Sequence, residues 1–312
     1  MPRDRSPGHD VTDETVLVTG GAGFIGSHVA DALVEDNDVR VLDDLSSGRR
    51  ENVPSGAELI RGDVRDPDLV ADAMAGVDLV FHEAAMVSVP ESVENPLGCH
   101  ETNATATVRL LEAARAEDAR VVYASSAAVY GRPESVPLAE GAPKRPTSPY
   151  GIEKLATDHY VRAYADLYDL ETVALRYFNV YGPRQAASDY SAVIDAFVEQ
   201  ALAGGPITVE GDGTQTRDFV HVSDVVQANL LAATTPHVGE AFNVGTGTSV
   251  SVLELARKIR EATGVDADVV HTDPRPGDID QSCPDIEKAR SLLGYEPTVT
   301  LDDGLGSVVE ER

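Results

Sequence analysis

Residues 15–26 read Thr15-Val-Leu-Val-Thr-Gly-Gly-Ala-Gly-Phe-Ile-Gly26, and this stretch decides the fold. Its first five residues form a β-rich apolar run, and residues 27–35 continue with the apolar spacing of a helix. A strand, a glycine turn and a helix in this order are the context in which Gly-x-Gly-x-x-Gly binds a dinucleotide. Gly21, Gly23 and Gly26 match that pattern, and Gly20 precedes it. Such glycines allow a tight turn and a close approach of the backbone to a pyrophosphate at the helix N-terminus.

Acidic residues at strand ends support a dinucleotide site. The extended run 38–42 is followed by Asp43 and Asp44, about 20 residues after the glycines. A carboxylate there accepts both hydroxyls of the adenosine ribose and repels a 2′-phosphate, which favours NAD over NADP. Either acid fits, and Asp43 is preferred because it ends the strand. Asp63, at the end of a third strand, is placed to bond the adenine amino group.

Strands and helices alternate through the first half of the chain. Strands are expected at 58–63, 77–85, 120–124 and 172–177, and helices at 67–74, 102–117 and 150–168. Such alternation implies a parallel sheet covered on both faces. The fold class is therefore α/β, a Rossmann-type doubly wound sheet. After residue 179 the pattern changes, which indicates a smaller C-terminal domain interleaved with returns to the sheet.

Tyr150 and Lys154 stand four positions apart in an expected helix, so they share one face. A nearby ammonium favours the phenolate and lowers the pKa of a tyrosine. A phenol tuned in this way exchanges a proton with an alcohol or sugar hydroxyl. Ser125 and Ser126 end a central strand, where open α/β sheets bind ligands. Tyr-x-x-x-Lys also occurs by chance in amphipathic helices, so the pair gains weight only from its context.

Composition excludes several classes of function. The net charge of −28 argues against nucleic acid, because phosphate contacts need a basic face. No apolar run is long enough for a membrane span, and the start of the chain lacks the apolar region of a secretory signal. Cys99 and Cys283 form neither a disulfide framework nor a metal spacing, which suits a reduced cytoplasm. The acidity is typical of proteins from a high-salt cytoplasm, where ions screen self-repulsion.

Seven motifs occur in the order found in one known family: T-G-G-A-G-F-I-G, G-D-V-R-D, S-S-A-A-V-Y-G, S-P-Y-G-I-E-K, R-Y-F-N-V-Y-G-P, R-D-F-V-H-V-S-D and F-N-V-G-T-G. The chain resembles the extended short-chain dehydrogenase/reductase superfamily. Within it, the chain is most similar to the NAD-dependent nucleotide-sugar epimerases, above all the UDP-glucose 4-epimerases. The resemblance covers residues 16–297 and implies an isomerase that oxidises its sugar transiently.

The resemblance implies roles for individual residues. Ser126 corresponds to the serine that bonds the sugar, with Ser125 as the less favoured neighbour. Tyr150 corresponds to the residue that exchanges the proton, and Lys154 to the residue that holds the nicotinamide ribose and lowers the tyrosine pKa. Further cofactor-binding residues implied are Gly20, Gly23, Phe24, Ile25, Gly26, Asp43, Asp44, Asp63, Val64, Ala84, Ala85 and Phe178. Substrate contacts implied are Asn179, Arg217, Arg275, Asp278 and Ser282; no metal is expected.

The resemblance leaves the sugar open. Residues 126–128 are Ser-Ala-Ala where 4,6-dehydratases carry Thr-Asp-Glu, which disfavours dehydration. Ser282 is small at the position that gates the sugar pocket, so UDP-GlcNAc/UDP-GalNAc is admitted as well as UDP-Glc/UDP-Gal. UDP-glucuronate epimerisation or decarboxylation, or another nucleotide-sugar dehydratase or reductase activity, remains an alternative. For UDP-glucuronate, Arg184 is a candidate cation. A non-catalytic NAD-binding sensor is a further alternative, although Ser126, Tyr150 and Lys154 together argue against it.

The resemblance also implies the organisation of the chain. We expect an NAD-binding domain at 14–178 plus about 217–246, and a nucleotide-sugar-binding domain at about 179–216 plus 247–312. Residues 1–13 are charged and contain two prolines, which predicts a flexible tail. We expect a cytoplasmic homodimer formed through the helices at about 102–117 and 150–168.

Overall fold

The computed structural model describes residues 11–185, 193–274 and 279–312. Within these residues, seven parallel strands form the main sheet in the spatial order β11–β6–β5–β4–β1–β2–β3. Their bounds are β1 Thr15–Thr19, β2 Asp38–Asp43, β3 Glu58–Arg61, β4 Leu79–His82, β5 Arg120–Ser126, β6 Thr172–Tyr177 and β11 Glu240–Val244. The strand order reverses between β1 and β4, so the predicted doubly wound sheet is confirmed. Ligands bind at such a reversal, beyond the carboxyl ends of the strands.

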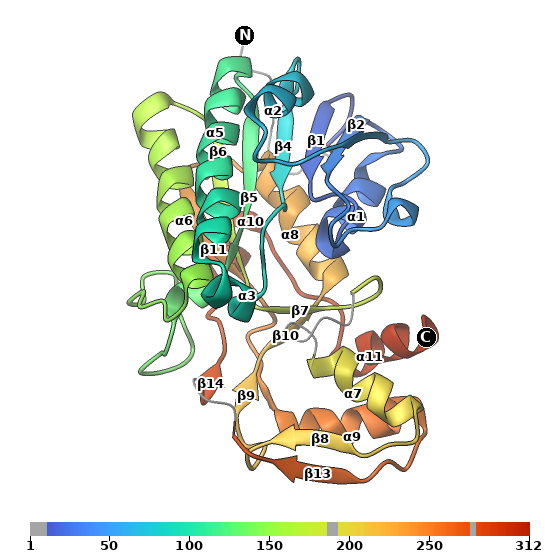
Figure 1. Cartoon of the computed structure of the whole chain (residues 1–312). Coiled ribbons are helices and arrows are strands. Elements are labelled where there is room, and N and C mark those ends of the chain that lie inside the picture. The colour runs from blue at the N-terminus through green and yellow to red at the C-terminus, as the bar shows by residue number, and fades with distance from the viewer. Residues whose placement is uncertain (1–10, 186–192, 275–278) are drawn as a thin grey trace.

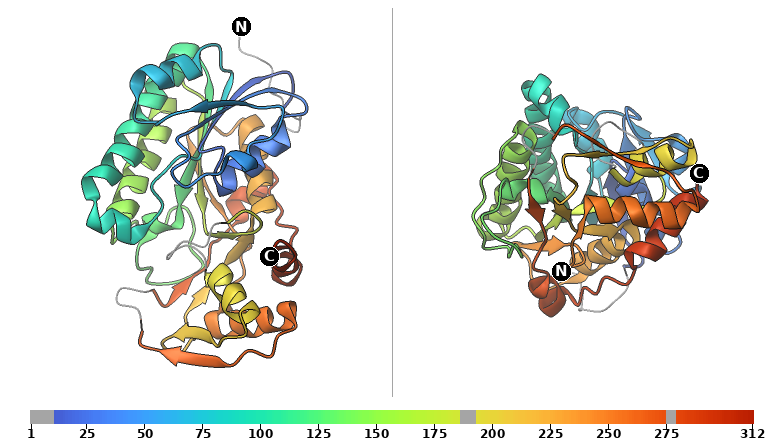
Figure 2. Two further views of the ribbon diagram at one scale, coloured as in Figure 1. Left: turned by 45° about the vertical axis from the view of Figure 1, so that its right-hand side comes forward. Right: turned by 90° about the horizontal axis from the view of Figure 1, so that it is seen from below.

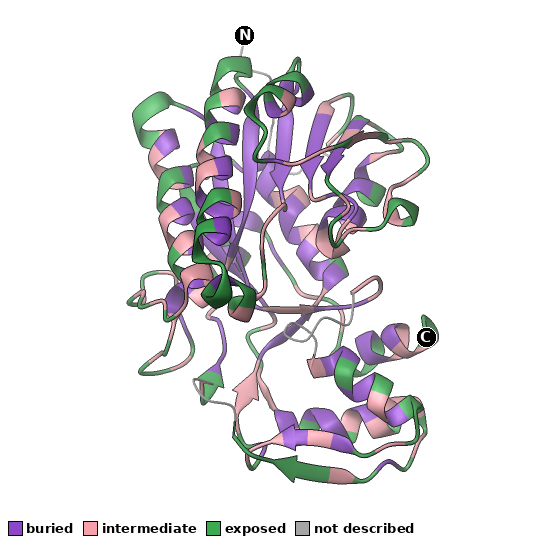
Figure 3. Ribbon diagram, viewed as in Figure 1, coloured by how far each residue is buried: buried purple, intermediate pink, exposed green. Residues whose placement is uncertain are grey.

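Helices cover both faces of the sheet (Figure 1). One face carries α1 Phe24–Leu33, α8 Val222–Thr234 and α10 Glu287–Leu293; the other carries α2 Pro67–Met74, α5 Ala106–Glu117 and α6 Pro149–Tyr168. Each face has its own apolar cluster, represented by Val29 and Val225 on the first and by Leu110 and Val161 on the second. The strands between them are mostly buried, as Figure 3 shows, except for the edge strand β3. Burial on two sides explains why these strands are continuous apolar runs.

A second group of elements lies beyond the carboxyl edge of the sheet (Figures 1 and 2). It contains α7 Val193–Leu202, β8 Ile207–Glu210, α9 Val252–Thr263, β13 Val269–Thr272 and α11 Leu301–Glu310. Phe197, Leu255 and Leu305 belong to its separate apolar cluster. Short strands lie between this group and the sheet: β7 Asn179–Tyr181, β9 Thr216–Arg217, β10 Phe219–His221, β12 Val250–Ser251 and β14 Gln281–Ser282. These short strands bring segments that are distant in sequence to the carboxyl end of the main sheet.

The helix expected at 102–117 begins differently from the prediction. Its first part is a π-helix, η2 His100–Thr105, and α5 follows from residue 106. The buried Asn103 side chain accepts a hydrogen bond from Met86 N (2.8 Å) and donates one to Met86 O (2.9 Å). Single π-turns of this kind are common at functional sites. Shorter elements complete the described chain: η1 Arg50–Asn52, α3 Val89–Glu94, α4 Pro96–Cys99 and η3 Ala127–Tyr130.

Within the described residues, no helix combines the length and the apolar character that a membrane crossing requires.

Candidate active site

The backbone of the glycine loop between β1 and α1 packs directly against the backbone that follows β4 and against the start of α1. Gly20 has φ +69°, and a Cβ there would lie 2.8 Å from Ala84 N. A Cβ on Gly26 would lie 2.4 Å from Gly20 O, so α1 sits directly on the loop. Gly23 precedes α1, and no side chain caps this helix. The amides of the first turn are therefore left for an anion, and a dinucleotide pyrophosphate fits this cradle.

Asp43 ends β2 beside this loop and is nearly buried. Its carboxylate accepts hydrogen bonds from Ala22 N (2.9 Å) and Leu45 N (2.8 Å), so it ties the glycine loop to the strand end. Asp44 is exposed, and its Oδ1 accepts a hydrogen bond from Ser46 N at 2.8 Å. The structure thus separates the two acids, and Asp43 is the one that lies against the loop. Its contact with an adenosine ribose stays a prediction.

The remaining predicted cofactor residues surround the same edge. Hydrogen bonds from Arg65 lower the pKa of Asp63, whose carboxylate lies 2.9 Å from Arg65 Nε. Val64 and Phe178 are buried, and Ala84 donates to Thr19 Oγ1 at 3.3 Å. The other members of this set, all partly buried, are Phe24, Ile25 and Ala85.

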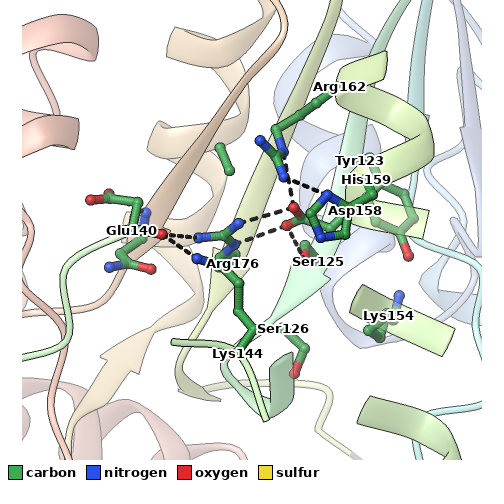
Figure 4. Close-up of polar contacts among 12 residues, drawn as sticks. Tyr123, Ser125, Ser126, Glu140, Lys144, Lys154, Asp158, His159, Arg162 and Arg176 are labelled. Carbon is green, nitrogen blue, oxygen red and sulfur yellow. Dashed lines mark hydrogen bonds and ion pairs between the residues drawn. The ribbon is translucent and has the colours of Figure 1, made fainter. Parts of the chain in front are cut away.

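The two adjacent serines at the end of β5 point to opposite faces, as residues of a strand do. Ser125 Oγ donates to Asp158 Oδ2 at 3.0 Å, inside the protein. Ser126 Oγ accepts from Ala128 N at 3.1 Å and shares a hydrogen bond with the Tyr150 phenol. Figure 4 shows Ser125 directed toward Asp158 and Ser126 away from it. The structure therefore brings Ser126, and not Ser125, together with Tyr150.

Close packing of α6 on η3 sets the position of Tyr150. Ser148 caps α6 by accepting a hydrogen bond from Gly151 N at 3.2 Å. A Cβ on Gly151 would lie 2.9 Å from Ala128 O, so the helix start touches the main chain that follows Ser126. Sequence reasoning missed Gly151, although its place directly after the candidate tyrosine was a visible signal.

Lys154 lies one turn further along α6, with 3% of its surface exposed. Its Nζ donates to Ala124 O at 2.6 Å. Burial lowers the pKa of Lys154 to about 8, against the charge of Glu83, which raises it. That Lys154 lowers the tyrosine pKa stays a prediction. Burial raises the pKa of Tyr150, and the hydrogen bond from Ser126 offsets this only in part.

A cavity of about 210 Å³ opens beside Ser126. Its walls come from four stretches of the chain: Ser126, Ala127, Ala128, Gly131, Tyr177, Phe178, Asn179, Arg217, Ile279 and Ser282. Three of the predicted substrate residues, Asn179, Arg217 and Ser282, therefore meet at one cavity with Ser126. Arg217 and Ser282 lie opposite each other in the pairing of β9 with β14. Arg275 and Asp278 lie outside the described residues.

A buried ion pair beneath Ser126 was not predicted. Arg176 donates from Nε and Nη2 to the two oxygens of Asp158, each at 2.9 Å (Figure 4). Arg162 Nε adds a third contact at 3.0 Å. Burial acts to raise the pKa of Asp158, but the bonds and charges of the arginines outweigh it and hold the pKa below its usual value. The network fixes β5, β6 and α6 to one another immediately behind the site.

Sequence reasoning also missed a carboxylate next to the glycine loop. Glu83 follows β4, and its main-chain N donates to Thr19 O at 3.1 Å. Its Oε1 accepts a hydrogen bond from Tyr177 OH at 2.8 Å, and Asn229 Nδ2 donates to the same phenol at 2.8 Å. Burial raises the pKa of Glu83 to about 7. His82 is buried between Thr19 and Thr107, which fits its interpretation as a packed strand residue.

The guanidinium of Arg184 turns toward α1. Its Nη1 lies 2.6 Å from Asp31 Oδ2 and 3.2 Å from Ser27 Oγ. Its main-chain N donates to both carboxylate oxygens of Glu311 at 2.9 Å. Arg184 does not belong to the described lining of the cavity beside Ser126. The described chain also holds no cluster of three His, Cys, Asp or Glu side chains suited to a metal ion.

Three features lie together at the point where the strand order reverses: the glycine loop, the uncapped N-terminus of α1, and the cluster of Ser126, Tyr150 and Lys154. This combination is typical of enzymes that carry out redox chemistry with a bound dinucleotide. The profile of the NAD dependent epimerase/dehydratase family matches residues 16–245, so the chain belongs to that family. The predicted family resemblance is thereby confirmed.

Relatives narrow the comparison further. A putative UDP-glucose 4-epimerase of Methanocaldococcus jannaschii is 42% identical over 298 residues, covering 94% of this chain and 97% of the relative. The solved UDP-N-acetylglucosamine 4-epimerase of Methanobrevibacter ruminantium, in complex with UDP-N-acetylmuramic acid, has a TM-score of 0.93 at 38% identity, covering 96% of this chain and 98% of the other. The Thermotoga maritima UDP-glucose 4-epimerase with UDP-glucose has a TM-score of 0.92 at 40% identity, covering 95% and 98%.

Proposed function

We propose that the chain is an NAD-dependent 4-epimerase of a UDP-hexose that works through a transient 4-keto sugar. The observation that carries the proposal is the hydrogen bond between Ser126 and Tyr150, one turn before Lys154 on α6, beside a cavity that Ser126 and Arg217 line. A forked guanidinium suits a nucleotide diphosphate. The names of the relatives give the same reaction.

The chain's own residues handle binding and the proton. The cradle of Gly20, Gly23 and Gly26, with Asp43, holds the dinucleotide, and Lys154 holds its nicotinamide ribose. When bound, NAD supplies an acceptor for the C4 hydride and a positive charge that favours the phenolate. The Tyr150 oxygen takes the proton of the sugar hydroxyl, with Ser126 orienting that hydroxyl. After the keto sugar has rotated to present its other face, C4 takes the hydride back on that face and Tyr150 returns the proton to the oxygen.

A turnover assay without added NAD tests this function. The purified chain is incubated in molar salt with UDP-Glc, UDP-GlcNAc or UDP-glucuronate. Conversion of UDP-Glc to its C4 epimer supports the proposal and shows that NAD stays bound. Tyr150→Phe should retain NAD and lose turnover, whereas a binding sensor would keep its function. If none of the three sugars is converted although NAD is bound, the UDP-hexose proposal is wrong. Conversion of UDP-glucuronate alone would favour the UDP-glucuronate alternative.

We propose that Ser282 lets the site accept an N-acetylated sugar. Ser282 is nearly buried in β14 and lines the cavity, so a larger side chain there would take up its space. Ser282→Tyr should reduce turnover of UDP-GlcNAc about tenfold or more relative to UDP-Glc, a discrimination of about 1.4 kcal/mol or more. If UDP-GlcNAc is neither substrate nor inhibitor of the unaltered chain, the idea is wrong.

We propose that the chain forms a homodimer through the helices at about 102–117 and 150–168, together with α3 and α4, which pack against α6. Leu97 and Ile152 are 75% and 51% exposed, and Val93 on α3 and Leu167 near the end of α6 are also exposed. An apolar surface of this kind is typical of an interface between copies. Light scattering should give about twice the chain mass, and Leu97→Glu with Ile152→Glu should give monomers. Val238→Glu, on another surface, is the control; a monomeric unaltered chain would contradict the proposal.

We propose that the chain works in a salt-rich cytoplasm. The acidic surface and the two free, buried cysteines support this. Screening of self-repulsion should raise the urea midpoint of unfolding between 0.1 and about 2 M KCl, since the Debye length falls from about 10 Å to under 3 Å. A midpoint that is flat or falls with KCl would contradict it.

A further inference from the structure

Asp218 is a fully buried acid at the junction of three cavity residues. It directly follows Arg217, which ends β9. Its main-chain N donates to Ser282 O at 3.0 Å. Its main-chain O accepts hydrogen bonds from Asn179 N at 3.3 Å and from Asn179 Nδ2 at 2.7 Å. Because Arg217, Asn179 and Ser282 all line the cavity beside Ser126, the backbone of Asp218 ties one wall of that cavity together.

The carboxylate of Asp218 holds the loop that follows β11. Its Oδ1 accepts a hydrogen bond from Thr246 N at 2.9 Å, and its Oδ2 accepts from Thr246 Oγ1 and from Thr248 N, each at 2.9 Å. The same loop leads into β12, where Val250 pairs with Arg217. The carboxylate therefore closes a ring of contacts that runs from β9 through the loop and β12 back to β9.

We propose that Asp218 is a positioning residue that fixes the Arg217 side of the cavity for a nucleoside diphosphate. A guanidinium binds two phosphates well only when its backbone is held in one place, and small displacements of such a clamp are costly. An amide cannot replace the carboxylate, because asparagine has one acceptor oxygen and its NH₂ group would face an N–H donor of the loop. The inference rests on the proposed function in that Arg217 contacts the diphosphate.

Asp224 provides a matched control in the same stretch of sequence. It is also buried, and its carboxylate also accepts hydrogen bonds from main-chain N–H groups and a threonine hydroxyl. The donors are Thr298 N at 2.9 Å, Thr298 Oγ1 at 3.0 Å and Val299 N at 3.2 Å. None of these three residues belongs to the described lining of the cavity beside Ser126. Asp218→Asn and Asp224→Asn should therefore lower the free energy of unfolding by similar amounts.

Calorimetric titration of UDP into the full chain, purified with its bound nucleotide, separates positioning from stability. Asp218→Asn should raise the dissociation constant of UDP at least about tenfold. Asp224→Asn should leave that constant unchanged, and both variants should retain the bound nucleotide. In turnover, Asp218→Asn should raise KM while kcat changes little, because the groups that handle the proton lie on β5 and α6.

A milder pair of variants tests the same contact if Asp218→Asn does not fold. Thr246→Val removes only the hydroxyl that donates to Asp218 and keeps the main-chain N–H. It should raise the dissociation constant of UDP about threefold, the effect of one hydrogen bond. Thr298→Val removes the corresponding hydroxyl at Asp224 and should leave UDP binding unchanged.

Three results would overturn the inference: equal UDP binding by the two members of either pair, a fall in kcat of Asp218→Asn with KM unchanged, or an unaltered chain that does not bind UDP. The titration needs no turnover. If the unaltered chain binds UDP but converts none of the three sugars, the epimerase proposal falls, and the difference between Asp218→Asn and Asp224→Asn in UDP binding still decides the role of Asp218.

Discussion

Asp158→Asn should destabilise the fold by about 3–5 kcal/mol, the typical cost of removing one partner from a buried ion pair. Four hydrogen bonds reach the Asp158 carboxylate, from Ser125 Oγ, Arg162 Nε and two guanidinium nitrogens of Arg176. Asparagine keeps the shape of the side chain, but its NH₂ group is a donor that faces the other donors. The positive charge of Arg176 is then left without a counter-charge. Arg176 is 1% exposed, so water cannot replace the lost carboxylate.

Urea unfolding of the purified chain in molar KCl measures the effect. Screening acts weakly on a buried pair, so the loss should persist in salt. Glu134→Gln is the matched control, because Glu134 also pairs with an arginine, at 2.6 Å, but both side chains are exposed. It should cost at most about 1 kcal/mol. Asp158→Leu with Arg176→Met should recover most of the loss. A cost of Asp158→Asn equal to that of Glu134→Gln would refute the reasoning.

Three further outcomes are expected. The pKa of Glu83 is about 7 in the folded protein and 4.5 ordinarily, so its ionisation lowers the free energy of unfolding as pH rises between those values. The free energy of unfolding of Glu83→Gln, measured with urea, should therefore rise by up to about 3 kcal/mol relative to the unaltered chain between pH 5 and pH 8. A difference that does not depend on pH would contradict this. Gly151→Ala favours the helix by up to about 1 kcal/mol, but the new methyl group presses on Ala128 O and displaces Tyr150 from Ser126. Turnover should therefore fall at least about tenfold, while the urea midpoint of unfolding changes little. Gly26→Val cannot be accommodated against Gly20 O, and the purified protein should have lost its bound nucleotide, which absorbance at 260 nm measures.

The parts of this molecule that the sequence predicted are those whose signal is local. The strand, glycine turn and helix at 15–33 lie in one stretch, and so do Tyr150 and Lys154, because one helical turn separates them. The choice between Ser125 and Ser126 needed the structure, since the direction in which a strand-end serine points depends on β5 pairing with its neighbours. The helix expected at 102–117 starts as a π-helix where Asn103 bonds to Met86, a contact across 17 positions.

Electrostatics was the least predictable part. Asp158 and Arg176 lie 18 residues apart on different elements, and neither belongs to a pattern that suggests a pair. The pKa of Tyr150 depends on how deeply α6 packs on η3, and spacing alone says nothing about desolvation. Glu83 has no helical partner, so its link to Tyr177, 94 positions away, emerges only when β4 and β6 lie in one sheet.

The cavity wall has two origins. Ser126 and Tyr177 sit on strands of the large sheet, whereas Arg217 and Ser282 sit on the short strands β9 and β14. Substitutions in β9 and β14 therefore change one wall of the cavity and leave the residues on β5, β6 and α6 as they are. Under the proposed function, this division lets directed evolution vary the sugar-facing wall while the residues that handle the proton are kept.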